Sequence, residues 1–205
     1  MSTLTNKMNI VFDLGRVLID WNANKALHKR FPDQAHHSLI RQSIFEHEDW
    51  LAMDKGTLSE EEAIANFHAR TGFAQQQLAL LMQDVRESLT PLEDSWAFLH
   101  ELHQQGYPLY CLSNMPAIMF AHLKARYDRW HVFKGIVISG EIGMMKPDLE
   151  IFEHLLQSYH LLPEETVFID DLEANIIGAR RAGVHAVQFT NLEECRQALQ
   201  IVLRK

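Results

Sequence analysis

Five short apolar runs in this chain are typical of buried β-strands, and they cover residues 9–13, 108–113, 135–139, 166–170 and 184–189. After residue 106 these runs alternate with segments of helical spacing at about 117–128, 148–160 and 172–182. A last helix is predicted after Asn191, with Glu194 completing its N-terminal cap. This alternation predicts an α/β fold: a three-layer, Rossmann-like, mostly parallel sheet with helices on both faces.

Residues from about 22 to 88 have helical periodicity and no convincing strand. Two capping boxes are expected around this segment, one at Ser59 with Glu62 and one at Thr90 with Glu93. Residues 14–20 are predicted to form a turn and a short hairpin. We therefore expect a catalytic core made of residues 9–20 and 89–205, with a helical cap at 21–88 inserted after the first strand.

Composition narrows the class of protein. The 205 residues carry a formal net charge of −8 and have no run of five basic residues, which argues against nucleic acid as a partner. No apolar run approaches the ~20 residues that span a bilayer, and the N-terminal residues lack the apolar stretch of a secretion signal. We expect a cytoplasmic protein with no membrane partner, with Cys111 and Cys195 as reduced thiols.

Polar side chains follow four of the predicted strands. Asp13 ends the first, Ser113 ends the second, Lys146 follows the third, and Asp170 and Asp171 end the fourth. In an open parallel sheet ligands bind outside the carboxyl ends of the strands, so these side chains should converge on one site. Each has a structural explanation when taken alone, such as a helix cap or a turn, but jointly they favour a site that handles a phosphoryl group.

The convergence of three carboxylates implies a cation. Asp13, Asp170 and Asp171 would repel one another strongly at short distance unless a positive ion neutralised them. A small number of carboxylate and carbonyl oxygens, completed by water and phosphate oxygen, is the environment that Mg²⁺ prefers. We therefore expect Mg²⁺ as the cofactor.

These residues resemble a known family. In order and approximate spacing, four segments are similar to the four motifs of the haloacid dehalogenase superfamily: Phe12-Asp13-Leu14-Gly15, Leu112-Ser113-Asn114, Lys146-Pro147, and Phe168-Ile169-Asp170-Asp171 with Asn175 and Gly178. The resemblance extends from residue 9 to the end of the chain. Within the superfamily the sequence looks closest to bacterial glucose-1-phosphate phosphatases and to the phosphatase domain of soluble epoxide hydrolases.

The resemblance implies a role for each matching residue. Asp13 would be the nucleophile that forms an aspartyl-phosphate intermediate, and Lys146 would neutralise both the nucleophile and the phosphate. Ser113 and the backbone of Asn114 would hold phosphoryl oxygens. The metal would be ligated by Asp13, Asp171 and the carbonyl oxygen of Gly15, with Asp170 as a supporting partner.

Gly15 departs from the family pattern. Phosphatases of the family usually have an aspartate at this position, two residues after the nucleophile, and it protonates the leaving oxygen. General-acid assistance of this kind contributes ~10²–10⁴ in rate. Either the substrate has a good leaving group, or another acid replaces the missing one, and Asp20 is the first candidate. A solvated residue or helix cap is the alternative interpretation of Asp20.

The first functional hypothesis is thus a Mg²⁺-dependent phosphatase acting on a small phosphorylated metabolite, such as a sugar phosphate. A metal-independent 2-haloacid dehalogenase of the same fold would need no leaving-group acid, but it would have little reason to tolerate two adjacent carboxylates. A phosphate-sensing relative without turnover is a third hypothesis. Cap residues, including Glu46, His47, Trp50 and Asp54, are candidates for substrate contact that the pattern cannot distinguish from a packed helix face.

Overall fold

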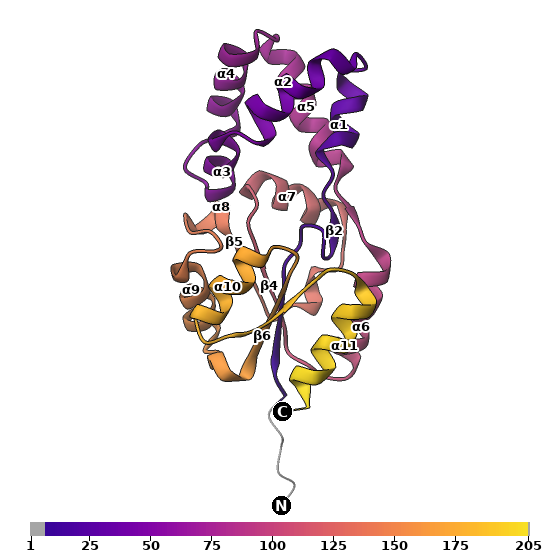
Figure 1. The fold of residues 1–205 in the computed structure, drawn as a ribbon, viewed down its shortest axis with the longest axis vertical. Helices are drawn as coiled ribbons and strands as arrows, with labels where there is room; N and C mark the ends of the chain where they lie inside the picture. Colours follow the sequence, from indigo (N-terminus) through magenta and orange to yellow (C-terminus); the bar gives the residue numbers. More distant parts are fainter. Residues whose placement is uncertain (1–6, 205) are drawn as a thin grey trace, which may run out of the picture.

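The computed structural model describes residues 7–204, and its centre is a parallel five-stranded sheet (Figure 1). The strands are β1 (Asn9–Phe12), β4 (Leu109–Ser113), β5 (Gly135–Ile138), β6 (Thr166–Asp170) and β7 (His185–Gln188), in the spatial order β5-β4-β1-β6-β7. β1 lies in the middle, and Phe12 is level with Cys111 of β4 and Ile169 of β6. β4 and β5 lie on one side of β1, and β6 and β7 lie on the other. A crevice is expected at the carboxyl ends of the central strands, where the strand order switches sides.

Alternate residues of each strand pack against opposite helical layers, which gives the three-layer α/β architecture expected from the sequence. Val11, Leu112 and Phe168 face α9 (Leu149–Tyr159) and α10 (Glu173–Arg181). Ile10, Phe12 and neighbouring side chains face α6 (Glu93–Gln104), α7 (Ala117–Arg126) and α11 (Leu192–Leu203). A short helix, α8 (Ser139–Ile142), follows β5. Because both faces are covered, the inner positions of the central strands are apolar, and most of their polar residues lie at the strand ends.

The chain between β2 (Ile19–Asp20) and β3 (Thr90–Pro91) is helical. It contains α1 (Ala23–Arg30), α2 (His37–Ile40), α3 (Glu48–Lys55), α4 (Glu60–Thr71) and α5 (Gln75–Ser88), and a π-helical turn at Arg41–Phe45 links α2 to α3. In Figure 1 these helices stand above the carboxyl ends of the central strands. We propose that residues 21–88 form a cap domain and that residues 9–20 and 89–205 form the catalytic core.

Caps and turns define the cap helices. The capping box at Ser59 and Glu62 is present in both directions, as the sequence predicted. The second predicted box is wrong: Thr90 and Pro91 pair with Ile19 and Asp20 as an antiparallel ladder, and α6 begins only at Glu93. The same ladder includes residues 19–20, while the local contact within residues 14–20 is a turn that bridges Gly15 and Ile19. Long-range strand pairing therefore overrode the local cap signal.

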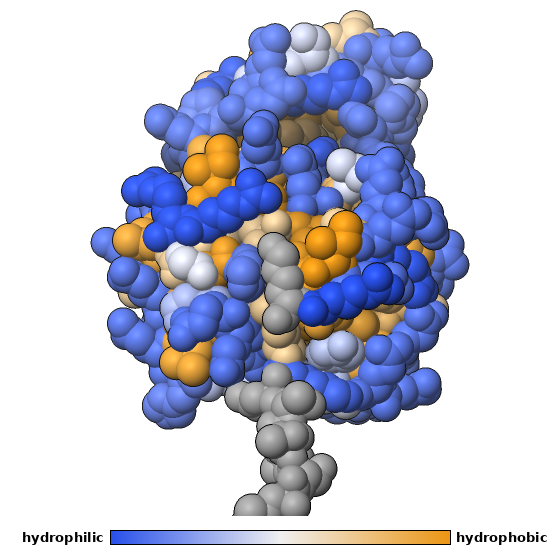
Figure 2. Space-filling view, turned by 60° about the horizontal axis from the view of Figure 1, so that its bottom comes forward, coloured by the Kyte–Doolittle hydropathy of each residue, from blue (hydrophilic) through white to orange (hydrophobic). Residues whose placement is uncertain are grey.

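Figure 2 shows the end of the molecule opposite the cap, where hydrophilic side chains predominate and apolar ones form separate patches. Small apolar patches that are separated by polar side chains are normal on the surface of a globular protein. Within residues 7–204, no helix has the length and apolar character needed to cross a bilayer.

Candidate active site

Asp13 lies at the carboxyl end of the central strand. Its backbone N–H donates to the carbonyl of Ile169 at 2.9 Å, which extends the β1–β6 ladder by one residue and fixes the start of the loop. The residue is only 7% exposed. The strand therefore delivers a nearly buried carboxylate to the floor of the crevice.

Lys146 neutralises this carboxylate from the loop between α8 and α9. Its Nζ lies 2.8 Å from Asp13 Oδ1 and 2.6 Å from Asp170 Oδ2, and it donates to the carbonyl of Leu112 at 3.0 Å. The Asn114 side chain holds the backbone of Lys146 through two hydrogen bonds of 2.9 Å, one in each direction. The end of β4 thereby positions the ammonium group between β1 and β6.

Asp170 is completely buried and its oxygens are already engaged. Besides Lys146, it accepts hydrogen bonds from both the Asn175 side chain, at 3.0 Å to each oxygen, and the backbone N–H of Leu172 at 2.8 Å. α10 packs closely on the loop that carries Lys146 and Pro147. This is possible because residue 178 is glycine, where a Cβ would lie 2.5 Å from the Pro147 carbonyl oxygen. Asp170 thus holds Lys146 in place rather than facing the crevice.

Burial and neighbouring charges change the acid–base properties of this group. Burial raises the pKa of Asp13 to about 6, with Lys146 opposing that shift and Asp170 adding to it. For Lys146, burial acts to lower the pKa, but Asp13 and Asp170 outweigh it and hold the pKa above its usual value. Lys146 is therefore a permanent cation at neutral pH.

Two carboxylates in a cluster of three are free to hold an ion. Asp13, Asp170 and Asp171 each offer an oxygen, and these oxygens lie within 4.8 Å of one another. Asp171 is half-buried, and its Oδ2 lies 3.7 Å from the Arg16 guanidinium. Burial, and then Asp170, raise the pKa of Asp171. Because Asp170 is saturated by protein donors, Asp13 and Asp171 are the residues free to face a hard cation, and the Gly15 backbone lines the same crevice.

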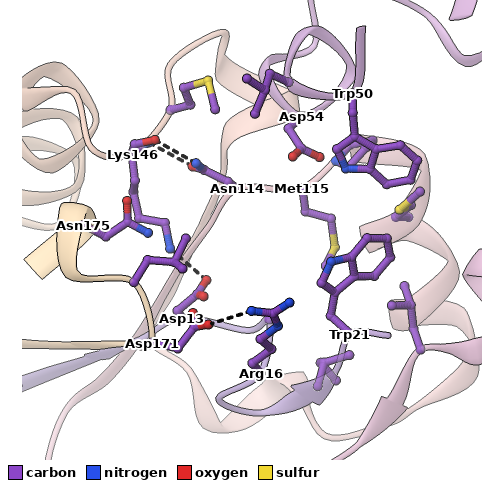
Figure 3. A pocket seen from close by; sticks show the side chains of 18 residues that line it. Asp13, Arg16, Trp21, Trp50, Asp54, Asn114, Met115, Lys146, Asp171 and Asn175 are labelled. Carbon is purple, nitrogen blue, oxygen red and sulfur yellow. Dashed lines mark hydrogen bonds and ion pairs between the residues drawn. The ribbon is translucent and has the colours of Figure 1, made fainter. Parts of the chain in front are cut away.

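The crevice is a cavity of about 280 Å³ between the core and the cap helix α3. Figure 3 shows its two different sides. Asp13, Asp171, Lys146 and Arg16 form a charged end, whereas the remaining wall is mainly aromatic and aliphatic. The apolar lining includes Trp21, Trp50, Leu51, Met115, Met119 and Met145. Trp21 and Trp50 pack against each other with ring centroids 5.4 Å apart.

The structure brings most of the sequence-predicted residues to this cavity, but Ser113 and Asp20 do not line it. Ser113 is buried at the end of β4, and its hydroxyl makes no hydrogen bond within residues 7–204. Asp20 is not brought to the cavity, since its carboxylate forms an ion pair with Lys25 at the start of α1. Of the cap candidates, Trp50 and Asp54 line the cavity, whereas Glu46 and His47 do not.

Two further lining residues, Arg16 and Trp21, were missed by the sequence interpretation. Arg16 lies in the tight turn after β1 and has a left-handed backbone conformation, with φ of 57°. Trp21 follows β2 directly, where the chain enters the cap. Their position next to the first motif was the available signal, because a loop that follows a catalytic strand borders the crevice.

With this fold and charged site, the chain belongs to the family of haloacid dehalogenase-like hydrolases, whose sequence model matches residues 3–183. It is 29% identical to the sesquiterpene phosphatase astK of Aspergillus oryzae over 193 residues, which cover 94% of this chain and 95% of that protein. It is 25% identical to a D-ribitol-5-phosphate phosphatase of Bacteroides thetaiotaomicron, over 95% of this chain and 98% of that one.

A solved structure from the same Bacteroides species has a similar fold. This enzyme of the same superfamily, bt-2542, is described as an Asp-to-Ala variant in complex with magnesium and inorganic phosphate. It superposes with a TM-score of 0.72 at 22% identity, over 89% of this chain and 93% of that one. The predicted superfamily and fold class are thus confirmed.

Proposed function

We propose that this protein is a Mg²⁺-dependent phosphatase that hydrolyses a phosphate monoester through an aspartyl-phosphate intermediate on Asp13. The observation that carries the proposal is the Lys146 ammonium, buried between Asp13 and Asp170 at one end of the cavity. Phosphoryl transfer requires a positioned nucleophile and fixed positive charge near the phosphoryl oxygens. Two relatives that match nearly the whole chain, the sesquiterpene phosphatase and the D-ribitol-5-phosphate phosphatase, support this chemistry over dehalogenation.

The side chains take complementary roles in this proposal. Asp13 attacks the phosphorus atom, while Lys146 offsets the negative charge of the carboxylate and the incoming phosphoryl group. The unpartnered hydroxyl of Ser113 and the backbone of Asn114 hold phosphoryl oxygens. Asp13, Asp171 and the Gly15 carbonyl would hold Mg²⁺, and Asp170 keeps Lys146 in place. The bound ion would supply additional positive charge against the developing phosphate charge.

The cavity wall favours an apolar alcohol as the leaving group. Away from the charged end, the wall is made mainly of tryptophan, methionine and leucine side chains, which offer little hydrogen bonding to the hydroxyls of a sugar. The similarity to a sesquiterpene phosphatase supports the same choice. The volume of about 280 Å³ is just below the ~300–1,000 Å³ usual for ligand sites, which fits a small ester. We therefore propose a monophosphate of a small apolar alcohol as substrate.

Phosphate release from paired substrates tests this function. We expect turnover of geranyl monophosphate to exceed that of glucose 6-phosphate, to require Mg²⁺, and to stop when the metal is chelated. The variant Asp13→Asn should lose more than ~10³-fold in turnover. Mass spectrometry of the acid-quenched wild type should find the phosphate on Asp13. Phosphate release by Asp13→Asn at the wild-type rate would contradict the assigned nucleophile, and metal-free halide release from 2-chloropropionate would indicate the dehalogenase instead.

A further inference from the structure

The proposed reaction has an unassigned proton. Expulsion of an alkoxide from a phosphate monoester is slow unless an acid protonates the leaving oxygen. Gly15 has no side chain to do this, and Asp20 is paired with Lys25 away from the cavity. If the substrate is an ordinary alcohol phosphate, the acid has to come from elsewhere in the cavity.

Asp54 supplies a carboxyl group on the opposite side of the cavity. It lies near the end of α3, one helical turn after Trp50, so both side chains project from the same face of the helix. In Figure 3 its carboxylate points into the cavity, facing the end that holds Asp13 and Lys146. The cavity between them has the size of a small ester.

The backbone of Asp54 is tied to the core. Ser139, which begins α8, donates from its hydroxyl to the Asp54 carbonyl, and the same hydroxyl accepts from the Met115 backbone N–H at 2.9 Å. One buried hydroxyl thus connects the cap helix to the loop that follows β4. This connection fixes the height of Asp54 above the phosphoryl end of the site.

The Asp54 carboxylate has no protein partner among the described residues. It forms no hydrogen bond or ion pair anywhere in residues 7–204, although the other buried or half-buried acids of the cap do. Asp49 pairs with Arg70 at 2.7 Å, and Asp84 pairs with Arg30 at 2.7 Å. Burial raises the pKa of Asp54 to about 7, with Asp13 adding to the shift and Lys146 opposing it. A substantial fraction of Asp54 is therefore protonated at neutral pH, as a general acid requires.

From this geometry we infer that Asp54 is the general acid and base of the reaction, supplied by the cap in place of the acid missing at Gly15. The inference rests on the proposed phosphatase function. As Asp13 attacks phosphorus, the bond from phosphorus to the leaving oxygen breaks, and Asp54 gives its proton to that oxygen. The Asp54 carboxylate then takes a proton from water as the water oxygen attacks the aspartyl-phosphate. Cleavage of the acyl phosphate bond returns the Asp13 carboxylate and releases inorganic phosphate.

The test compares two leaving groups. The comparison uses kcat/KM, which reports the steps up to departure of the alcohol and not the later hydrolysis of the aspartyl-phosphate. With an alkyl substrate such as octyl phosphate, Asp54→Asn should lose ~10²–10⁴ in kcat/KM, whereas with 4-nitrophenyl phosphate, whose leaving group needs no proton, the loss should stay below about tenfold. Asp49→Asn, the same change in the same helix, serves as the matched control and should not alter the ratio between the two substrates. An equal loss on both substrates, or no loss on the alkyl ester, would overturn the assignment.

Restoring the family acid provides a second test. A Cβ at Gly15 would lie 3.9 Å from Asp13 Oδ2, its nearest neighbour, and the backbone there is not in the left-handed region, so an aspartate can be accommodated. The double variant Gly15→Asp with Asp54→Asn should recover at least about tenfold in alkyl phosphate turnover relative to Asp54→Asn alone. Failure to recover activity in a folded double variant would count against the role of Asp54.

The pH profile keeps the inference testable even if a variant fails to fold. Wild-type kcat/KM on octyl phosphate should fall as pH rises above about 7, because Asp54 loses its proton. The same decline should be absent with 4-nitrophenyl phosphate. If the wild type hydrolyses both esters with identical profiles, Asp54 is not the acid although the phosphatase function stands. If it hydrolyses neither, the proposed function itself fails.

Discussion

Lys146 shows how strongly one side chain can depend on its neighbours. It is 2% exposed and contacts two buried carboxylates, so the three charges are stable only as a set. We predict that Lys146→Met destabilises the protein by about 3–5 kcal/mol, because Asp13 and Asp170 would remain buried without a counter-charge. Urea denaturation in metal-free buffer measures this loss, and turnover should fall as well.

The control for that prediction is Lys134→Met. Lys134 is exposed and makes no ion pair within the described part of the chain, so this variant should stay within about 0.5 kcal/mol of the wild type. Similar stability losses in the two variants would show that the Lys146 ion pairs are not what stabilises the site.

Site residues that lie at or just after strand ends could be predicted from the sequence, whereas site residues positioned by the packing of the cap could not. Asp13, Lys146 and Asp171 could be grouped because parallel strands end at one edge of a sheet. Asp54 could not be singled out, because its position depends on how α3 packs over the core. Asp20 illustrates the opposite error: it follows the first motif closely, but the structure pairs it with Lys25 at the entrance to the cap.

Among the helices, α1 and α5 of the cap are joined by a buried carboxylate. Asp84 on α5 is 3% exposed and pairs with Arg30 and Lys29 of α1, each at 2.7 Å. Burial acts to raise the pKa of Asp84, but hydrogen bonds from Arg30 and Lys29 outweigh it and lower the pKa. We predict that Asp84→Asn costs about 1–3 kcal/mol at pH 7.

The sign of the pH dependence follows from the direction of that pKa shift. A carboxyl group whose pKa is lower in the folded protein binds fewer protons there, so its stabilising effect is present above the unfolded pKa of about 4. It is lost as pH falls through the lower folded value. The difference in unfolding free energy between wild type and Asp84→Asn should therefore be largest near neutral pH and shrink in acid. Glu87→Gln, a change at an exposed neighbour in the same network, should lower the stability less than Asp84→Asn does, because solvent screens its ion pair with Lys29.

The elements themselves were predictable where local and long-range signals agreed. The parallel strands and the helices after β4 were found within a few residues, because buried runs and caps point to the same boundaries. Thr90 and Pro91 failed as a helix start because their partners, Ile19 and Asp20, are distant in sequence. The local pattern also gave no sign of the π-helical turn at Arg41–Phe45.

For the whole molecule, the contact between cap and core depends on two glycines. Gly56, which ends α3 with φ of 78°, packs so closely on Gly140 of α8 that a Cβ there would lie 2.5 Å from the Gly140 carbonyl oxygen. We predict that Gly56→Ala separates α3 from α8, displaces Asp54 and lowers kcat/KM for the alkyl ester by at least about tenfold. A misplacement of ~1 Å is enough for an effect of this size. Steady-state kinetics measures the change.

Gly72 provides a matched control for this substitution. It also ends a cap helix with a positive φ, of 74°, but a Cβ there would have no neighbour within 4 Å. Gly72→Ala should therefore share the backbone strain of about 1 kcal/mol without the clash, and it should retain wild-type kcat/KM. Equal kinetic effects in the two variants would show that strain, and not the cap–core contact, is responsible.

The pairing of β2 with β3 determines how the cap is connected to the core. The polypeptide leaves the core and returns to it on adjacent strands, which lie only about 4.8 Å apart. The chain between β2 and β3 is an insertion whose two ends are joined by the hydrogen bonds of this ladder. The inserted segment can therefore differ in length and shape without changing the order of the strands in the main sheet. The same catalytic core is thus compatible with different inserted caps.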